Sequence, residues 1–214
     1  MIDLSHEIKD GLVTYRGLPA PTISEHLTRA ASRAIYAEGT EFHIGKIEMV
    51  ANTGTYLDTP FHRYADGADL AQLDLTAVAD LDAIVIDGGA TRAIDVDVFA
   101  QHDVRGRAVL VRTGWDAHWQ TEQYFTGHPF LTRAAAEYLV AAGARLVGID
   151  SLNIDDTHDL ARPAHTLLLG AGILIVEHMC NLAALPSNGF RFFAVPVKVK
   201  GMGTFPVRAF ALIE

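Results

Sequence analysis

Residues 108–177 alternate between short apolar runs and stretches with helical spacing, and this alternation constrains the fold more than any other feature of the sequence. Helices are predicted at 131–142, where Thr132 is the expected N-cap and Gly143 follows the last turn, and at 163–169. The apolar runs around them read as buried strands, at 108–112, 145–149 and 173–177. A β-α-β-α-β order favours parallel pairing in an α/β layer.

The remaining sequence predicts strands that do not alternate with helices, at 42–50, 83–87, 191–198 and 206–213. Only a loop with two glycines separates the last two of these. The chain has 214 residues with neither a repeat nor a low-complexity linker, so we expect a single domain over 1–214. The predicted fold class is α/β with a mixed sheet. No G-x-G-x-x-G or P-loop sequence follows a strand to indicate nucleotide binding.

Charge and cysteine content limit the partners and the compartment. With 17 Lys and Arg against 26 Asp and Glu, the net charge of −9 argues against nucleic acid and anionic membranes as partners. The sole cysteine, Cys180, cannot form an internal disulfide, and it is expected to be a small buried hydrophobe rather than a nucleophile. The sequence begins without a secretory signal, and no apolar run reaches the ~18–20 residues of a membrane helix. We therefore expect a cytoplasmic enzyme that acts on small molecules.

The most informative stretch follows a predicted strand and runs from Asn52 to His62. It holds few large apolar side chains, and a glycine and a proline mark it as a structured loop. Asn52, Tyr56, Asp58 and His62 stand at even spacing, which in extended backbone directs side chains to one face. The stretch forms either the polar lining of a pocket or a hydrogen-bonded turn in which Asp58 caps backbone amides.

A second group of polar residues surrounds the predicted strand 173–177. Glu177 ends this apolar strand, where a carboxylate is costly to bury unless it is paired, ligated or solvated in a cleft. His165 begins the preceding short helix, and sites usually form at strand carboxyl ends in α/β layers. Imidazole with carboxylates suits Zn²⁺ or Mn²⁺, while a structural role for each residue alone is the alternative. Residues 150–156 could shape the same pocket, but a surface loop with self-satisfied Asx turns is the favoured interpretation.

Together these residues resemble a family of metal-dependent hydrolases that includes kynurenine formamidase, isatin hydrolase and the "cyclases". The family's loop reads His-x-Gly-Thr-His-x-Asp-x-Pro-x-His, and residues 52–62 follow it as Asn-Thr-Gly-Thr-Tyr-Leu-Asp-Thr-Pro-Phe-His. The family's later His, with a Glu twelve residues on, matches His165 and Glu177. Flanking segments agree along essentially the whole chain: Asp3-Leu4-Ser5, Arg112-Thr113-Gly114-Trp115, Gly148-Ile149-Asp150 and Pro206-Val207-Arg208-Ala209.

The resemblance implies a fold, an assembly and a set of roles. The fold is a compact swivelling β/β/α type, the assembly a homodimer or a homotetramer built as a dimer of dimers, and the cofactor one or two Zn²⁺ or Mn²⁺ ions. By matching position, Asp58, His165 and Glu177 fall on metal ligands and His62 on the catalytic acid and base. Tyr15 falls near an aromatic residue that contacts the substrate in formamidases.

Two departures from the family pattern change what it implies. Asn52 and Tyr56 stand where the family has histidine ligands, and an amide oxygen or a neutral phenol is a weak ligand for Zn²⁺. One imidazole and two carboxylates remain, enough for one ion completed by water. The loss of nitrogen ligands shifts the preference towards Mn²⁺ or Mg²⁺. A metal-free site, in which Tyr56 and Asn52 polarise a carbonyl and His62 acts alone, is the alternative.

The main functional hypothesis is a hydrolase that cleaves an amide, lactam, lactone or related C–N or C–O bond of a small molecule. A metal-bound water would attack, with His62 and Asp58 as catalytic residues. The side chains expected to contact the substrate or its oxyanion are Tyr15, Phe42, Asn52 and Tyr56. The alternatives are a metal-independent cyclase, lyase or isomerase that uses His62 and Tyr56, and a non-catalytic binding protein.

Overall fold

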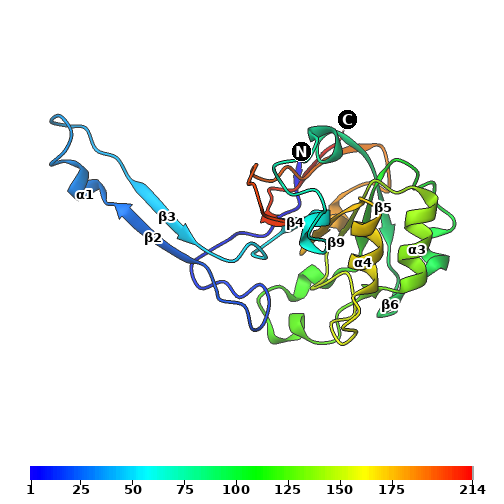
Figure 1. Ribbon diagram of the computed structural model, residues 1–214. Helices are drawn as coiled ribbons and strands as arrows, with labels where there is room; N and C mark the ends of the chain where they lie inside the picture. Colours follow the sequence, from blue (N-terminus) through cyan, green and yellow to red (C-terminus); the bar gives the residue numbers. More distant parts are fainter. Residues whose placement is uncertain (214) are drawn as a thin grey trace.

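Nine strands form one mixed sheet at the centre of the molecule, which the computed structural model describes for residues 1–213 (Figure 1). In chain order they are β1 (Ile2–Asp3), β4 (Tyr56–Asp58), β5 (Leu81–Asp87), β7 (Ala108–Arg112), β9 (Leu146–Ile149), β10 (Leu174–Glu177), β11 (Phe190–Phe193), β12 (Thr204–Pro206) and β13 (Phe210–Ile213). Across the sheet their order is β1-β13-β11-β5-β7-β9-β10-β4-β12. The strands β5, β7, β9 and β10 pair in parallel and the other neighbours antiparallel. The predicted α/β class with a mixed sheet is confirmed.

Shorter elements complete the chain. The helices are α1 (Arg29–Ser32), α2 (Val96–Phe99), α3 (Arg133–Ala142) and α4 (Pro163–Gly170). Two small strand pairs lie outside the main sheet, β2 (Thr22–Leu27) with β3 (Ile44–Glu48) and β6 (Ala93–Ile94) with β8 (Phe130–Leu131). Single 3₁₀ turns occur at Pro60–His62, Leu75–Ala77, Trp115–His118, Glu122–Phe125 and Leu182–Ala184.

The central strands bury both of their faces, as their continuous apolar runs predict. On one face, Val109 and Val147 pack with Leu139 of α3 and Leu168 of α4. On the other face, the alternate residues of the same strands, such as Leu110, join a second apolar cluster with the aromatic side chains of β11. The sheet thus separates two cores, and α2, α3 and α4 cover one of them.

The helices begin and end where local chemistry predicts. The Thr132 hydroxyl accepts the Ala135 N–H at 3.1 Å and so caps α3, while Gly143 ends it in the left-handed conformation, at φ 78°. Pro163 occupies the first turn of α4, where its missing N–H costs nothing.

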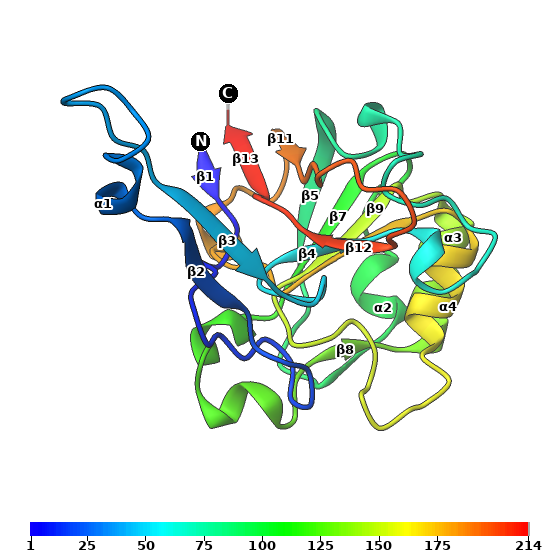
Figure 2. The ribbon, with the colours of Figure 1, turned by 60° about the vertical axis from the view of Figure 1, so that its left-hand side comes forward.

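The sheet is curled, as the short connection between its last two strands in the chain requires (Figure 2). β12 lies at one edge, whereas β13 is next to the opposite edge. In a flat sheet, seven strand spacings of about 4.8 Å would separate them by roughly 34 Å. Only residues 207–209 join them, and so short a segment spans about 14 Å at most. The prediction of one continuous strand at 206–213 is therefore wrong. The strand predicted at 191–198 also ends early, at Phe193, before Pro196, which has no N–H to donate to a ladder.

A two-stranded arm extends away from the body of the molecule (Figure 1). It consists of β2 and β3 with α1 between them. Apolar side chains are exposed along it, including Ile23, Ile44 and Ile47. Phe42 also lies on this arm, half exposed and in edge contact with Tyr36 at a ring distance of 4.8 Å.

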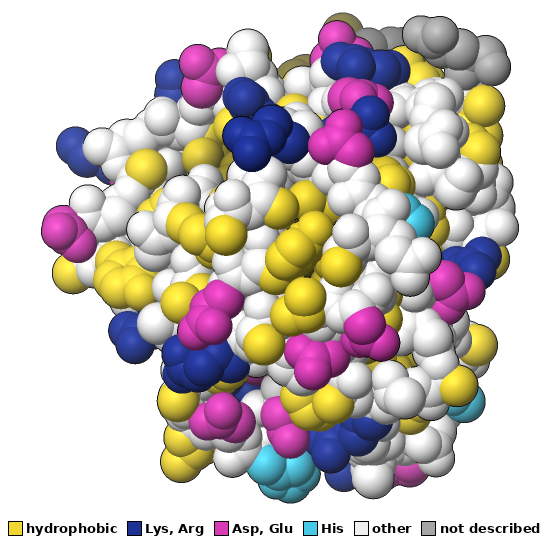
Figure 3. All heavy atoms as spheres, turned by 90° about the vertical axis from the view of Figure 1, so that its right-hand side faces the viewer, with side chains coloured by type: hydrophobic (Ala, Val, Ile, Leu, Met, Phe, Trp, Pro, Cys, Tyr) yellow, Lys and Arg dark blue, Asp and Glu magenta, His cyan; other side chains and the backbone are white. Residues whose placement is uncertain are grey.

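The surface carries charges of both signs. On the face that bears α3, acidic and basic side chains are interspersed with apolar ones (Figure 3). Within residues 1–213, no helix has the length and apolar character needed to cross a membrane.

Candidate active site

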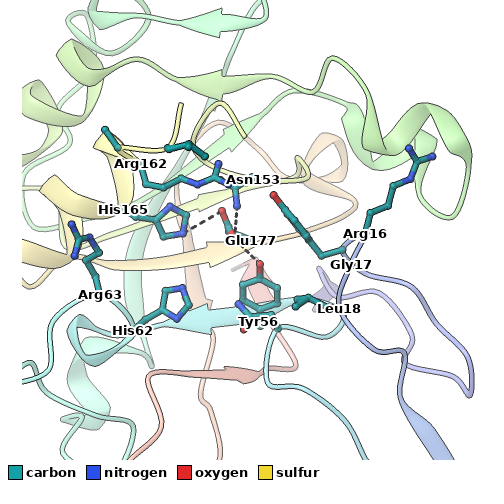
Figure 4. A pocket seen from close by; sticks show the side chains of 14 residues that line it. Arg16, Gly17, Leu18, Tyr56, His62, Arg63, Asn153, Arg162, His165 and Glu177 are labelled. Carbon is teal, nitrogen blue, oxygen red and sulfur yellow. Dashed lines mark hydrogen bonds and ion pairs between the residues drawn. The ribbon is translucent and has the colours of Figure 1, made fainter. Parts of the chain in front are cut away.

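A cavity of about 500 Å³ opens beside β4, β10 and the start of α4 (Figure 4). It collects most of the residues that the sequence singles out: Tyr15, Asn52, Tyr56, His62, His165 and Glu177. Asp58 lies fully buried beside them. Phe42 does not line the cavity, because it lies on the arm. The predicted contact of Phe42 with the substrate is therefore not made within one chain.

Asp58, His165 and Glu177 meet because β4 pairs antiparallel with β10, which sets Asp58 opposite Ile175 and Tyr56 opposite Glu177. The His165 Nε2 atom lies 3.7 Å from Asp58 Oδ2 and 3.7 Å from Glu177 Oε1. Three residues far apart in the sequence thus surround one point in space.

His62 joins this group. Possible ligand atoms of Asp58, His62 and His165 all lie within 4.8 Å of one another, and the two imidazole rings are 5.9 Å apart. The compact set of possible ligands within residues 1–213 therefore contains His62 with the predicted ligands Asp58 and His165, and it does not include Glu177.

Asp155 orients His165, a role that the sequence did not reveal. The buried Asp155 carboxylate accepts the backbone N–H groups of Ala164 and His165 at 2.6 and 3.0 Å, and it contacts His165 Nδ1 at 2.6 Å. A carboxylate at that distance accepts the Nδ1 proton, so in the neutral imidazole the Nε2 lone pair faces Asp58 and Glu177. Asp155 therefore fixes the orientation of the His165 ring and caps α4 with the same side chain.

The charges around His165 favour a cation. Burial opposes protonation of this imidazole, but the charges of Glu177 and Asp58 and the hydrogen bond to Asp155 outweigh it and raise the pKa to about 10. Oδ2 of Asp58 is fully buried and has no hydrogen-bond partner among the described residues. A buried carboxylate oxygen without a partner is costly. A divalent cation between Asp58 and His165 would satisfy it, so these donors fit a metal ion.

Glu177 is more fully engaged than the other predicted ligands. Its Oε1 accepts the Ile154 N–H at 2.6 Å, and its Oε2 accepts the Tyr56 hydroxyl at 2.7 Å. The Asn153 amide nitrogen also lies near Oε2, at 3.5 Å. Each carboxylate oxygen has two lone pairs, so Glu177 can still face a cation. These bonds hold it in one orientation.

Thr204 connects His62 with Asp58 and is a second residue that sequence reasoning missed. β12 pairs with β4 so that Thr204 is opposite Asp58. The Thr204 hydroxyl donates a short hydrogen bond to Asp58 Oδ1 and lies 2.8 Å from His62 Nδ1. Because its one proton goes to Asp58, this hydroxyl accepts a proton from Nδ1. The Nε2 atom of a neutral His62 is then left as an acceptor.

Backbone contacts fix the turn that carries His62. A Cβ atom on Gly203 would lie 2.2 Å from the His62 backbone nitrogen, and one on Gly67 would lie 2.6 Å from the Pro60 carbonyl carbon. Both values are far below normal contact distances. Only glycine permits the main chain to approach this closely at the two positions.

Tyr56 acts as a hydrogen-bond donor within a buried network. Its hydroxyl also lies 3.3 Å from Nε2 of His178, whose Nδ1 lies 2.9 Å from the Tyr124 hydroxyl. Burial, followed by the charges of Glu177 and Asp58, raises the pKa of Tyr56 well above its usual range. The phenol therefore stays neutral and holds Glu177 in place.

Two further interpretations are settled by burial. Residues 150–156 are not a surface loop, because Asp150 and Asp155 are buried and Asn153 faces Glu177. Asp150 accepts the N–H groups that follow β7, and Asp155 binds the first turn of α4, contacts that the local sequence cannot show. Cys180 is buried, and burial raises the pKa of its thiol to about 12, in keeping with the predicted hydrophobe.

Comparisons with known proteins agree with this fold and site. The family model Cyclase, described as "Putative cyclase", matches residues 2–156. Proteins named kynurenine formamidase from Bacillus cytotoxicus and Geobacillus thermodenitrificans are 28% and 29% identical over 209 and 210 residues. Each match covers 97% of this chain and 95% of the relative.

Solved structures show the same architecture. One described as "Potential Metal-Dependent Hydrolase With Cyclase Activity" is 25% identical, with a TM-score of 0.78 over 97% of this chain and 94% of its own. Isatin hydrolase A from Ralstonia solanacearum, at 23% identity, matches with a TM-score of 0.83 over 100% of this chain and 91% of its own. The family match covers most of the chain, and the chain therefore belongs to the cyclase family.

Proposed function

We propose that this protein hydrolyses an amide or lactam bond of a small molecule, with one divalent metal ion held by Asp58, His165 and Glu177 and with His62 as acid and base. The observation that carries the proposal is the convergence of the partnerless Asp58 Oδ2 and the His165 Nε2 atom at 3.7 Å. That the chain is an amidohydrolase is supported by its relatives named kynurenine formamidase. The same mechanism would also hydrolyse lactones and related C–O bonds.

When bound, the ion supplies a Lewis acid that makes water nucleophilic near neutral pH. Manganese and zinc are the two candidates, since the ligands are mixed imidazole and carboxylate. Asp155 keeps the His165 Nε2 lone pair directed at the ion, and the bonds to Glu177 from Tyr56 and Ile154 keep that carboxylate in one orientation. These contacts prearrange the ligands before any substrate arrives.

His62 moves the proton in this scheme. Thr204 fixes the ring through Nδ1 and leaves Nε2 as the acceptor. His62 takes a proton from the attacking water as the new C–O bond forms, and it returns that proton to the leaving nitrogen as the C–N bond breaks. Asp58 has two proposed roles: it would bind the cation, and it orients the Thr204 hydroxyl that contacts His62. Tyr15, Asn52 and Tyr56 are the proposed contacts of the substrate and its oxyanion.

We also propose that the chain acts as one domain in the cytoplasm, as a homodimer or a homotetramer. The arm supports a multimer, because an isolated two-stranded ribbon is marginally stable and its apolar side chains Ile23, Ile44 and Ile47 lack cover in a single chain. Cover by a second chain would also enclose Phe42, and a role for Phe42 in a neighbouring site stays a prediction.

The test combines metal analysis with turnover. The purified protein is expected to bind about one equivalent of Mn²⁺ or Zn²⁺ and to lose hydrolysis of aryl formamides and cyclic amides when a chelator removes it. The His62→Ala variant is expected to keep the metal and to lose roughly 10²–10⁴-fold in kcat. Hydrolysis that survives full removal of metal would instead support a metal-independent enzyme. Undiminished turnover by His62→Ala would exclude the proposed role of His62.

A further inference from the structure

Two arginines line the cavity, Arg63 and Arg162, and neither forms an ion pair with an acidic side chain of residues 1–213. Most other arginines lie within 4.0 Å of an acidic oxygen, as Arg16 does with Glu122 and Arg92 with Asp156. Within residues 1–213, Arg63 and Arg162 have no such ion pair. Arg63 donates to the Thr166 hydroxyl at 3.3 Å, and Arg162 donates to the backbone carbonyl of residue 156 at 3.1 Å.

Both arginines are placed beside the proposed chemistry. Arg63 directly follows His62, and Arg162 immediately precedes the helix that begins with Pro163 and carries His165. Figure 4 shows the two arginines on the same side of the cavity as the two imidazoles, whereas Arg16 extends away from it.

The backbone at Arg162 supports a specific role. Its φ of 46° lies in the left-handed region, which non-glycine residues rarely adopt. Such conformations persist where the surrounding structure enforces them, and they concentrate at binding sites. Here the Thr166 N–H donates to the Arg162 carbonyl at 2.9 Å, while the guanidinium is tied to residue 156. The side chain is thus held at the cavity.

An anion is the ligand that this arrangement suits. The chain has a net charge of −9, and the acidic Glu177 lines the cavity with the buried Asp58 beside it. In such a chain, two guanidinium groups without ion pairs supply positive charge at the cavity that can attract an anion. A guanidinium binds a carboxylate through two parallel hydrogen bonds.

We propose that Arg63 and Arg162 bind a carboxylate of the substrate, so that the preferred substrates are amides or lactams that carry a carboxylate away from the bond that breaks. This inference rests on the proposed hydrolase function. Arg16 takes no part in it, because Glu122 neutralises Arg16.

The test uses two probes that share one scissile bond. 2-Formamidobenzoate and formanilide are both aryl formamides, and they differ only in the carboxylate. The metal-loaded wild type is expected to favour the acid by at least tenfold in kcat/KM. The Arg63→Gln and Arg162→Gln variants should each lose about 10–100-fold on the acid, mainly through KM, and less than twofold on formanilide. Arg105→Gln is the matched control, since Arg105 also has no ion pair within the described chain.

A binding measurement separates failure of this inference from failure of the proposed function. Titration calorimetry compares 2-aminobenzoate with 2-aminobenzamide on the same proteins, with thermal melting to confirm that each variant is folded. If neither formamide is hydrolysed but the two substitutions weaken aminobenzoate at least tenfold, anion recognition stands without formamidase activity. Equal kcat/KM on both probes, or aminobenzoate binding that the substitutions leave unchanged, would overturn the inference.

Discussion

The Asp155→Asn substitution is the sharpest test of how this site is built. Asparagine has the same size, and its Oδ1 can still accept the Ala164 N–H. It replaces Oδ2, which accepts both the His165 backbone N–H and the Nδ1 proton, with an amide that donates. An amide donor facing Nδ1 favours the tautomer that carries its proton on Nε2. That proton would then point at Asp58 and Glu177, where the cation is proposed to bind.

The size of the effect follows from the bonds that are lost. Two hydrogen bonds to a charged acceptor disappear, at about 1.5 kcal/mol each, so the free energy of unfolding should fall by about 3 kcal/mol. For a protein of this length, that lowers the melting temperature by roughly 6–12 °C. Loss of a carboxylate that orients a ligating histidine typically weakens metal binding by about 10–100-fold.

The assay is competition with a chromogenic chelator for Mn²⁺ and Zn²⁺, at a temperature where both proteins are folded. Asp156→Asn is the matched control, because it makes the same change in the next residue, whose carboxylate pairs with Arg92 instead. We expect weaker metal binding for Asp155→Asn alone. Equal metal affinity in the two variants would refute the argument that Asp155 sets the tautomer of His165.

Two further predictions concern Thr204 and His6. Thr204→Val keeps the side-chain shape and removes the hydroxyl between Asp58 and His62; kcat should fall about 10–100-fold with little change in KM, and Thr204→Ser should restore it. Unaltered kcat in the valine variant would show that His62 needs no such support. Burial, only partly offset by the charge of Asp116, lowers the pKa of His6 from 6.5 to about 4. The unfolded chain therefore binds more protons between these pH values, and stability is lost as pH falls through this window. His6→Phe keeps the stacking on Trp119 at 4.0 Å and removes the titration. When the pH falls from 7 to 5, the free energy of unfolding measured in urea should decrease by about 1 kcal/mol less for the variant than for the wild type, after allowance for partial exposure of the ring. An equal decrease in both proteins would contradict this prediction.

The sequence predicted those elements whose determinants are local. The strand at 108–112 and the helix that Thr132 and Gly143 delimit depend on periodicity and capping, and the structure shows them within two residues of the predicted bounds. The break between β12 and β13 depends on the curl of the whole sheet. No local pattern within residues 206–213 reports that curl.

The site divides in the same way. Asn52, Tyr56, His62 and Glu177 were visible because their residue types and spacing are unusual beside apolar strands. Asp155 was noted only within the stretch 150–156 and Thr204 not at all, because an aspartate after a strand and a threonine in a strand have ordinary structural roles. Their importance comes from hydrogen bonds between residues 10 and 146 positions apart in the sequence. The loop that leads into α4 creates the bond of Asp155 with His165, and the pairing of β12 with β4 creates the bond of Thr204 with Asp58.

The two glycines that press against the turn of His62 bear on how this cavity can change over time. At positions 52 and 56, a substitution exchanges a side chain in the lining and leaves the main chain where it is. At positions 67 and 203, any added carbon would collide with backbone and move His62 itself. Substitutions at positions 52 and 56 can therefore change substrate and metal preference, whereas substitutions at positions 67 and 203 would disrupt the site. A designer who wished to alter the chemistry would vary the former and leave the latter untouched.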